Sequence, residues 1–136
     1  MKSQSRWKFL LFAGFTAVLL NGCGSGDLQL SSVSGTVTLD DRPLPDATVE
    51  FQPDSGSFSE GVTDSSGNYT LRYNAKKKGA LPGKHQVRIT HSTRVDAQGQ
   101  KIDGPQLLPV RYNRFSELAV EVTSGSNKLD FPLKSK

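Results

Sequence analysis

Apolar side chains in the body of this chain recur at every second residue, and this period constrains the fold more than any other feature. The alternation is visible over residues 33–39, 47–52, 85–91, 118–122 and 129–133. Successive side chains of a β-strand point to opposite faces, so a period of two predicts strands buried on one face. No segment after residue 32 has the 3.6-residue apolar period of an amphipathic helix. The pattern predicts an all-β domain of about seven short strands in a single Greek-key sandwich.

Turn-forming residues separate these segments and suggest how they connect. Residues 40–46 (DDRPLPD) join the first two strands, which we expect to form a hairpin or near-hairpin. A short third strand is expected over 58–63, then a tight turn at 64–67, then a strand over 68–73. Residues 95–105 (VDAQGQKIDGP) have the composition of a long polar loop.

The first 22 residues have the pattern of a secretory signal peptide. Lys2, Arg6 and Lys8 supply positive charge, and residues 9–20 (FLLFAGFTAVLL) follow without a charged side chain. This apolar stretch is shorter than the roughly 20 residues that a membrane-spanning helix needs, but it fits the core of a signal peptide. A small residue, Gly22, stands where cleavage would occur.

The segment Leu20-Asn21-Gly22-Cys23 resembles the lipobox of bacterial lipoproteins, although Asn21 is a less usual occupant of its position. The resemblance implies cleavage before Cys23, a diacylglyceryl group on its thiol and an acyl group on its new amine. Two or more acyl chains anchor a protein stably, whereas one anchors it only marginally. The alternatives are an ordinary secreted protein with a stray cysteine and an uncleaved membrane anchor.

These features divide the chain into a signal peptide (1–22), a lipidated cysteine with a flexible tether (23–32) and a β-sandwich domain (33–136). A nine-residue flexible tether spans about 17 Å on average and about 30 Å when extended. The domain is therefore expected to lie close to the membrane. Gly24 is not the Asp that retains some lipoproteins in an inner membrane, which favours the outer membrane over the extracytoplasmic face of the inner membrane.

The net charge of +4 depends mainly on the predicted signal peptide. Without its three cations, 14 Lys and Arg remain against 13 Asp and Glu, so the domain is nearly neutral. This balance argues against a nucleic-acid partner. Because Cys23 is the sole cysteine, no disulfide can form within the chain.

Four segments in order resemble the carboxypeptidase-regulatory-like family: VSGTVT (33–38), RPLPDATV (42–49), TDSSGNYTL (63–71) and GALPGKHQV (79–87). The tail, LAVEVTSGSNKLDFPL (118–133), is similar to the last hairpin of small bacterial lipoproteins that carry this domain. The likeness covers nearly all of 33–133, although a histidine stands where the family often has an aromatic residue. It implies a transthyretin/Ig-like sandwich that serves as a non-catalytic accessory or binding module, not a peptidase.

The residues themselves offer little for catalysis. His85 and His91 would lie about 20 Å apart along one strand, too far to share a zinc ion, and we interpret them as packing residues. No G-x-S-x-G elbow is present. Asp64 begins a segment that faintly resembles a calcium loop but lacks the further acidic ligands, so we expect it to cap a turn. We expect no enzyme activity, no metal and no cofactor besides the covalent lipid.

Two groups of residues remain as candidate surface-binding sites. Lys76, Lys77 and Lys78 are expected in a loop, either as a solvated connection or in contact with anionic lipid or wall polymer. Tyr112 and Phe115 could form a small aromatic patch beside the long polar loop, or simply close the end of the sandwich. We expect an envelope protein or a polysaccharide as partner, with a glycan- or wall-binding module as the alternative to a protein-interaction module.

Overall fold

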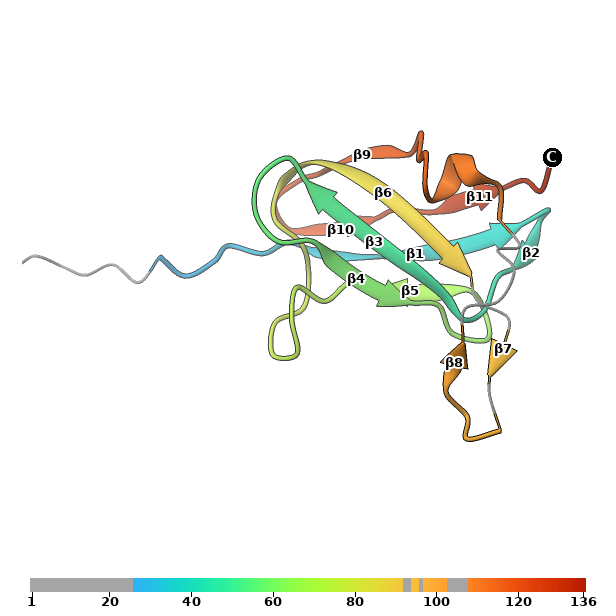
Figure 1. Cartoon of the computed structure of the whole chain (residues 1–136). Helices are drawn as coiled ribbons and strands as arrows, with labels where there is room; N and C mark the ends of the chain where they lie inside the picture. Colours follow the sequence, from blue (N-terminus) through green and yellow to red (C-terminus); the bar gives the residue numbers. More distant parts are fainter. Residues whose placement is uncertain (1–25, 92–93, 96, 103–107) are drawn as a thin grey trace, which may run out of the picture.

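The alternating segments form two packed β-sheets in the computed structural model, which describes residues 26–91, 94–95, 97–102 and 108–136 (Figure 1). Over these residues the structure is all-β apart from one turn of 3₁₀ helix, η1 (Val110–Tyr112). The fold is a β-sandwich, as the sequence pattern predicts.

The first sheet is built around the longest of its strands, β1 (Ser32–Leu39). On one side β1 pairs antiparallel with β5 (Asn68–Thr70) along its first half and with β2 (Arg42–Pro43) along its second half. On the other side it pairs parallel with β10 (Ser126–Lys128) and then with β11 (Phe131–Leu133). The first and last strands of the domain are therefore neighbours, which joins its two ends.

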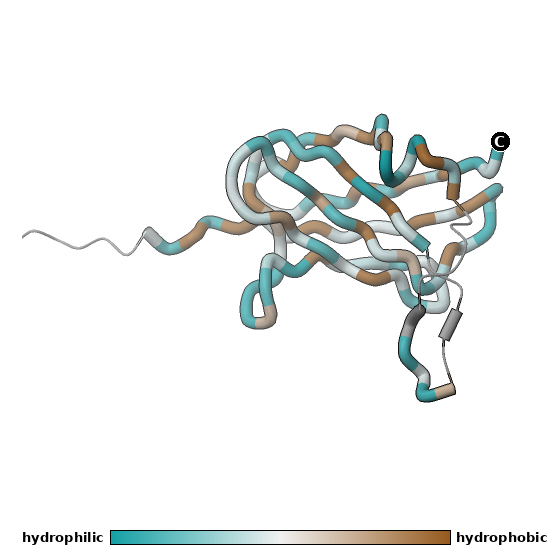
Figure 2. Tube along the Cα trace, in the orientation of Figure 1, coloured by the Kyte–Doolittle hydropathy of each residue, from teal (hydrophilic) through white to brown (hydrophobic). Residues whose placement is uncertain are grey.

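The second sheet has the order β4-β3-β6-β9 and is antiparallel throughout. Its strands are β4 (Ser59–Val62), β3 (Ala47–Pro53), β6 (Gly83–His91) and β9 (Ala119–Val122). Along β3 and β6 every second side chain is buried, which is the period that the sequence shows. Figure 2 shows the same alternation of hydrophobic and hydrophilic residues along these strands.

One expected connection is wrong, and another contains short strands. The predicted hairpin between 33–39 and 47–52 does not form, because β1 pairs with the two-residue strand β2 and the chain then crosses to the second sheet as β3. Leu44 is buried at the crossing, so the turn-rich segment carries a core residue that draws the chain inward. The predicted polar loop contains a small two-stranded ribbon, β7 (Arg94–Val95) with β8 (Lys101–Ile102).

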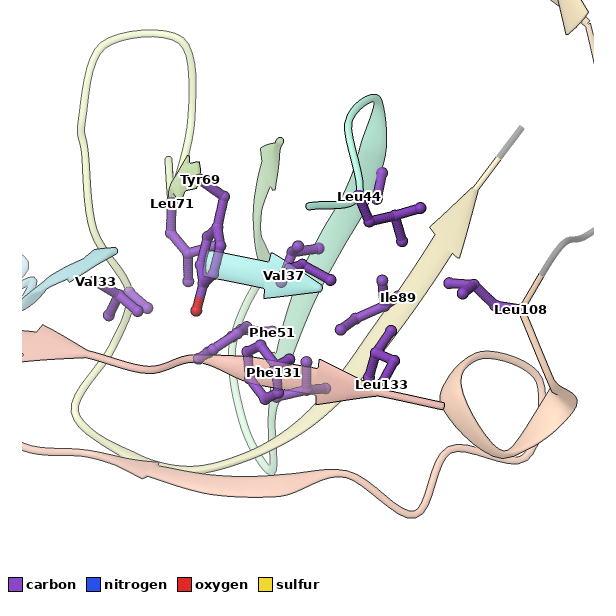
Figure 3. Packing of buried hydrophobic residues seen from close by; sticks show 14 of the residues in the cluster. Val33, Val37, Leu44, Phe51, Tyr69, Leu71, Ile89, Leu108, Phe131 and Leu133 are labelled. Atoms are coloured by element: carbon purple, nitrogen blue, oxygen red, sulfur yellow. The ribbon is translucent and has the colours of Figure 1, made fainter. Parts of the chain in front are cut away.

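The core lies between the two sheets and centres on three rings (Figure 3). Phe51 of β3 lies 6.5 Å from the Tyr69 ring of β5 and 6.0 Å from the Phe131 ring of β11, measured between centroids. Aromatic pairs at such distances add stabilisation beyond the area they bury. The aliphatic side chains of the same core include Val33, Val37, Leu44, Leu71, Ile89, Leu108 and Leu133.

The parallel pairing of the first and last strands is interrupted between β10 and β11, where the chain comes very close to β1. A Cβ on Gly35 would lie 1.9 Å from the Leu129 carbonyl oxygen, so only glycine fits here. The Leu129 amide donates to the Ser34 carbonyl, while the Thr36 amide donates to the Asp130 carboxylate at 2.8 Å. The carboxylate thus replaces a backbone acceptor at the interruption.

Tyr69 stabilises this interruption from the core side. Its hydroxyl donates to the Leu129 carbonyl at 2.5 Å. Burial, with a smaller contribution from the Asp130 carboxylate, raises the pKa of the Tyr69 hydroxyl above its ordinary value. The hydroxyl therefore stays protonated and remains a donor well above neutral pH.

Replacing Gly35 with Ala should destabilise the domain severely, because the new Cβ would overlap the Leu129 carbonyl. We expect the free energy of unfolding to fall by about 3 kcal/mol or more, at the upper end of overpacking effects. Urea unfolding measures this change. Gly26→Ala is the control, since its Cβ would meet nothing within 4 Å. Equal stability of the two variants would show that β1 and Leu129 are not held this closely.

Tyr69→Phe should lower the free energy of unfolding by about 1 to 2 kcal/mol, because it removes the donor to a partly buried carbonyl. Tyr73→Phe is the matched control: the Tyr73 hydroxyl has no hydrogen-bond partner in the described part of the chain, so its removal should change little. Thermal unfolding of both variants gives the comparison. A larger loss for Tyr73→Phe would contradict the role assigned to Tyr69.

Candidate functional site

The predicted lipidation site lies outside the residues that the structure describes. This holds for Cys23 and for the cleavage-site residues Leu20, Asn21 and Gly22. The described chain begins at Gly26 and runs towards the sandwich as an exposed segment. The described residues nearest to Cys23 are those where this segment joins the first sheet.

The chain joins the sandwich beside a loop that is clamped to it. Ser31 and Ala80 exchange two backbone hydrogen bonds, each 2.9 Å long. A Cβ on Gly79 would lie 2.3 Å from the Ser31 carbonyl oxygen, so this contact also requires glycine. The clamp holds the residues before Ala80 next to the segment that leads back to Cys23.

The loop before the clamp, residues 74–78, carries the predicted lysine cluster, and we call it the lysine loop. The Asn74 carboxamide oxygen accepts hydrogen bonds from the amides of Lys76 and Lys77, which fixes the turn. Lys76, Lys77 and Lys78 are all exposed, as the sequence predicts. The Lys77 ammonium lies 3.9 Å from the Asp27 carboxylate, but both side chains face solvent, so this ion pair contributes little. The lysine loop and the end that joins the tether lie at the same end of the domain (Figure 1).

The predicted patch of Tyr112 and Phe115 lies at the opposite end, near η1 and the C-terminus (Figure 1). Phe115 is 68% exposed, whereas Tyr112 is half-buried and packs against the core. The Arg111 guanidinium covers the Tyr112 ring at 4.8 Å, and the Tyr112 hydroxyl accepts from the Lys134 amide at 3.1 Å. Tyr112 is thus engaged in closing the sandwich, and only Phe115 remains as an exposed aromatic here.

The C-terminal residues dock on the turn between β1 and β2. The Ser135 amide donates to the Asp40 carboxylate at 3.0 Å, and the Lys134 ammonium lies 2.9 Å from the Asp41 carboxylate. The hydrogen bonds from Ser135, first from its side chain and then from its backbone, lower the pKa of Asp40. The paired aspartates therefore hold the tail rather than forming an acid–base pair.

A mixed polar and apolar groove of about 960 Å³ runs along the seam where β4 meets the chain after β5. Two apolar side chains in it are unusually exposed, Phe58 at 44% and Val62 at 51%. The half-buried Tyr73 adds a second aromatic ring. Polar lining comes from Thr48, Ser57, Glu60, Asp64, Asn68, Thr70, Arg72 and Asn74.

Two amides in the groove are oriented by their own hydrogen bonds. The Asn68 carboxamide oxygen accepts from the Thr36 hydroxyl at 2.9 Å, and the Asn74 oxygen is held by the lysine loop as described above. The Nδ2 groups of both residues, like the Glu60 carboxylate, have no partner among the described residues. The groove therefore presents fixed donors, an acceptor and aromatic surface that the fold itself does not use.

The backbone at the seam is already paired. Glu60 and Arg72 exchange two hydrogen bonds of 3.0 and 2.8 Å, which join the edge of the second sheet to the first. An added peptide strand would have to compete with these bonds. Recognition in the groove therefore depends on side chains.

The histidines and the Asp64 turn serve the fold. The Nε2 atoms of His85 and His91 lie 2.7 and 3.0 Å from the carbonyl oxygens of Leu81 and Pro45, and both rings are buried. The Asp64 carboxylate accepts from the amides of Ser66 and Asn68, as expected for a capped turn. Among the described residues no three His, Cys, Asp or Glu side chains gather where they could hold a metal ion. In the same part of the chain no helix has the length and apolar character needed to cross a bilayer.

Comparisons with known proteins do not assign the chain to a family. No protein-family model matches it, and no curated protein matches it. It is similar to the crystal structure of a DUF3823 family protein from Parabacteroides merdae ATCC 43184, with 14% identity and a TM-score of 0.45, covering 79% of this chain and 46% of that one. It is also similar to a 9R-lipoxygenase from Cyanothece PCC8801, with 20% identity and a TM-score of 0.38, covering 74% and 16%. The chain thus spans less than half the length of either protein, and at these values neither likeness assigns a function.

Sequence reasoning missed the groove. The sequence singles out only Tyr112 and Phe115 as surface aromatic residues, but Phe58 is also exposed because Ser59 takes the inward position at the start of β4. The alternation of Phe58, Glu60 and Val62 was a usable signal for an outward row. The residues that face this row across the seam, however, belong to the other sheet, and only the fold brings the two sides together.

Acid should release the C-terminal tail before it unfolds the domain. A carboxyl group whose pKa is lowered in the folded state stabilises the structure above its unfolded value, and this contribution is lost as the pH falls through the folded value. We therefore expect the protection of the Ser135 amide, relative to its intrinsic exchange rate at each pH, to be lost once the pH falls below the ordinary value of 3.8 for Asp40. Hydrogen exchange followed by NMR measures this.

Asp40→Asn is the control for this titration, because asparagine keeps an acceptor oxygen and tolerates the positive φ of 48° at this position. The pH dependence of the protection of the Ser135 amide should disappear in the variant. A tail that opens at the same pH in both proteins would assign the effect to another group.

Proposed function

We propose that this chain is a membrane-anchored lipoprotein whose β-sandwich is a non-catalytic interaction module at the cell envelope. A diacylglyceryl and N-acyl lipid on Cys23 would attach it to the membrane, with the outer membrane favoured. The sandwich would then present its groove to a partner in the envelope. The placement of the lysine loop beside the segment that leads to Cys23 carries this proposal.

The clamp between Ser31 and Ala80 supports a defined orientation of the domain. Ser31 comes only eight positions after Cys23 in the chain, a span of at most about 28 Å when extended. A lipid on Cys23 would therefore keep the lysine loop near the bilayer, where each lysine gains about 1 kcal/mol from anionic headgroups. The end with Phe115 and the C-terminus would point away from the membrane.

The non-catalytic role is supported by how the chemically versatile residues are used. Both histidines contact backbone carbonyls in the interior, and Asp64 caps a turn. Asp40 and Asp41 hold the tail. These contacts stabilise the fold, whereas the exposed amides and rings of the groove are available to a ligand.

Mass spectrometry of the N-terminus tests the anchor. In a bacterial host that processes lipoproteins, we expect a chain that begins at Cys23 and carries acyl groups. Cys23→Ser should move the protein from the detergent phase to the aqueous phase in Triton X-114 partition. Ser25→Ala, which leaves the lipobox-like segment intact, should remain in the detergent phase. An unmodified Cys23 in the mature protein would contradict the proposed lipid anchor.

The lysine loop should favour anionic membranes even without the lipid. In the Cys23→Ser background, we expect Lys76→Gln with Lys77→Gln to weaken binding to vesicles that contain phosphatidylglycerol by about 10- to 30-fold at low salt. Arg114→Gln with Lys136→Gln removes the same charge at the far end and should have little effect. Cosedimentation measures both. Equal losses would show that net charge, rather than the loop, determines binding.

A further inference from the structure

We propose that the groove between β4 and the chain after β5 binds a neutral glycan. This inference rests on the proposed function, because it names the chemical class of the partner. It also moves the predicted aromatic binding patch from Tyr112 and Phe115 to the opposite end of the sandwich, around Phe58 and Tyr73. Four properties of the groove lead to this ligand.

The first property is the exposed aromatic surface in the lining of the groove. Phe58 is 44% exposed and lines the groove together with Tyr73, whose hydroxyl has no partner in the described part of the chain. The C–H face of a sugar ring packs on such rings. Val62, 51% exposed, extends the apolar strip along β4.

The second property is a set of fixed hydrogen-bonding groups. The oxygens of Asn68 and Asn74 are already held, by the Thr36 hydroxyl and by the amides of Lys76 and Lys77. Their Nδ2 groups are therefore oriented before a ligand arrives, which lowers the entropy cost of binding. With the Glu60 carboxylate as an acceptor, the groove matches the paired donors and acceptors of sugar hydroxyls.

The third property is charge. The ionised side chains that line the groove are Glu60, Asp64 and Arg72, so it has no excess of positive charge. A polymer of phosphates or uronic acids would meet two carboxylates and one guanidinium. A neutral chain avoids this repulsion.

The fourth property is the paired backbone of the seam. Because Glu60 and Arg72 bond to each other, an extended peptide cannot add to β4 there without breaking two hydrogen bonds. Side chains must carry the recognition, which favours a ligand whose own hydroxyls supply the polar contacts.

The test is binding of the detergent-solubilised full chain to an array of neutral oligosaccharides with α- and β-linked hexoses and pentoses. We expect binding to at least one class of glycan. Phe58→Ala should weaken it about tenfold through loss of ring contact. Phe115→Ala is the matched control, since it removes an exposed phenylalanine at the other end and should leave the affinity unchanged.

Asn68→Asp provides a second, nearly isosteric variant. It keeps the oxygen that accepts from Thr36 but replaces the Nδ2 donor, so the fold should persist while glycan affinity falls at least fivefold. If Phe58→Ala proves unstable in thermal unfolding, this variant carries the test. Binding to no glycan, or equal affinity in the wild type and in a folded variant of the groove, would overturn the proposal. So would competition for the groove by an extended peptide.

Mass spectrometry of the same sample separates this proposal from the one it rests on. A lipidated chain that binds none of the glycans would contradict the proposed ligand but not the proposed lipid anchor. A chain without lipid that binds a glycan through Phe58 and Asn68 refutes the anchor but leaves the groove as the binding site.

Discussion

The close contact between β1 and the last part of the chain at Gly35 holds the domain together. At this point the Leu129 carbonyl occupies the space that a side chain on residue 35 would need. The same carbonyl accepts a hydrogen bond from the Tyr69 hydroxyl. The next residue, Asp130, accepts a hydrogen bond from the Thr36 amide through its carboxylate. These contacts join the first and last strands, which are almost a hundred residues apart. Since no disulfide is possible within this chain, the closure depends on packing and hydrogen bonds alone.

The aromatic core follows from this closure. Phe131 enters the core directly after the interruption and packs edge-on against Phe51 of the opposite sheet. Tyr69 contacts both rings and also holds Leu129, so the same side chain links the core to the contact between the strands. A change at Gly35 would therefore reach the second sheet through these rings.

The sandwich separates two kinds of surface. One end joins the tether and carries the lysine loop, whereas the other end is occupied by η1 and the docked tail (Figure 1). The groove lies along the seam between the sheets, and Asn74 belongs both to it and to the lysine loop. A bilayer at the tether end and a glycan in the groove would thus be neighbours, which suits a module that holds an envelope polymer near a membrane.

The sequence by itself determined the longer strands and which of their faces are buried, because side chains alternate in a strand and the apolar ones recur at every second residue. It also placed the lysines in an exposed loop and Asp64 in a capped turn. Strand pairing was harder: β1 pairs with β2 and not with β3, because the buried Leu44 draws the chain across to the other sheet. Only the tertiary structure decided the groove, since its two sides, residues 58–62 and 68–74, are joined across the seam by the hydrogen bonds between Glu60 and Arg72. The physical reason is that a local pattern reports the face of a strand, whereas a seam depends on contacts between strands that the pattern does not encode.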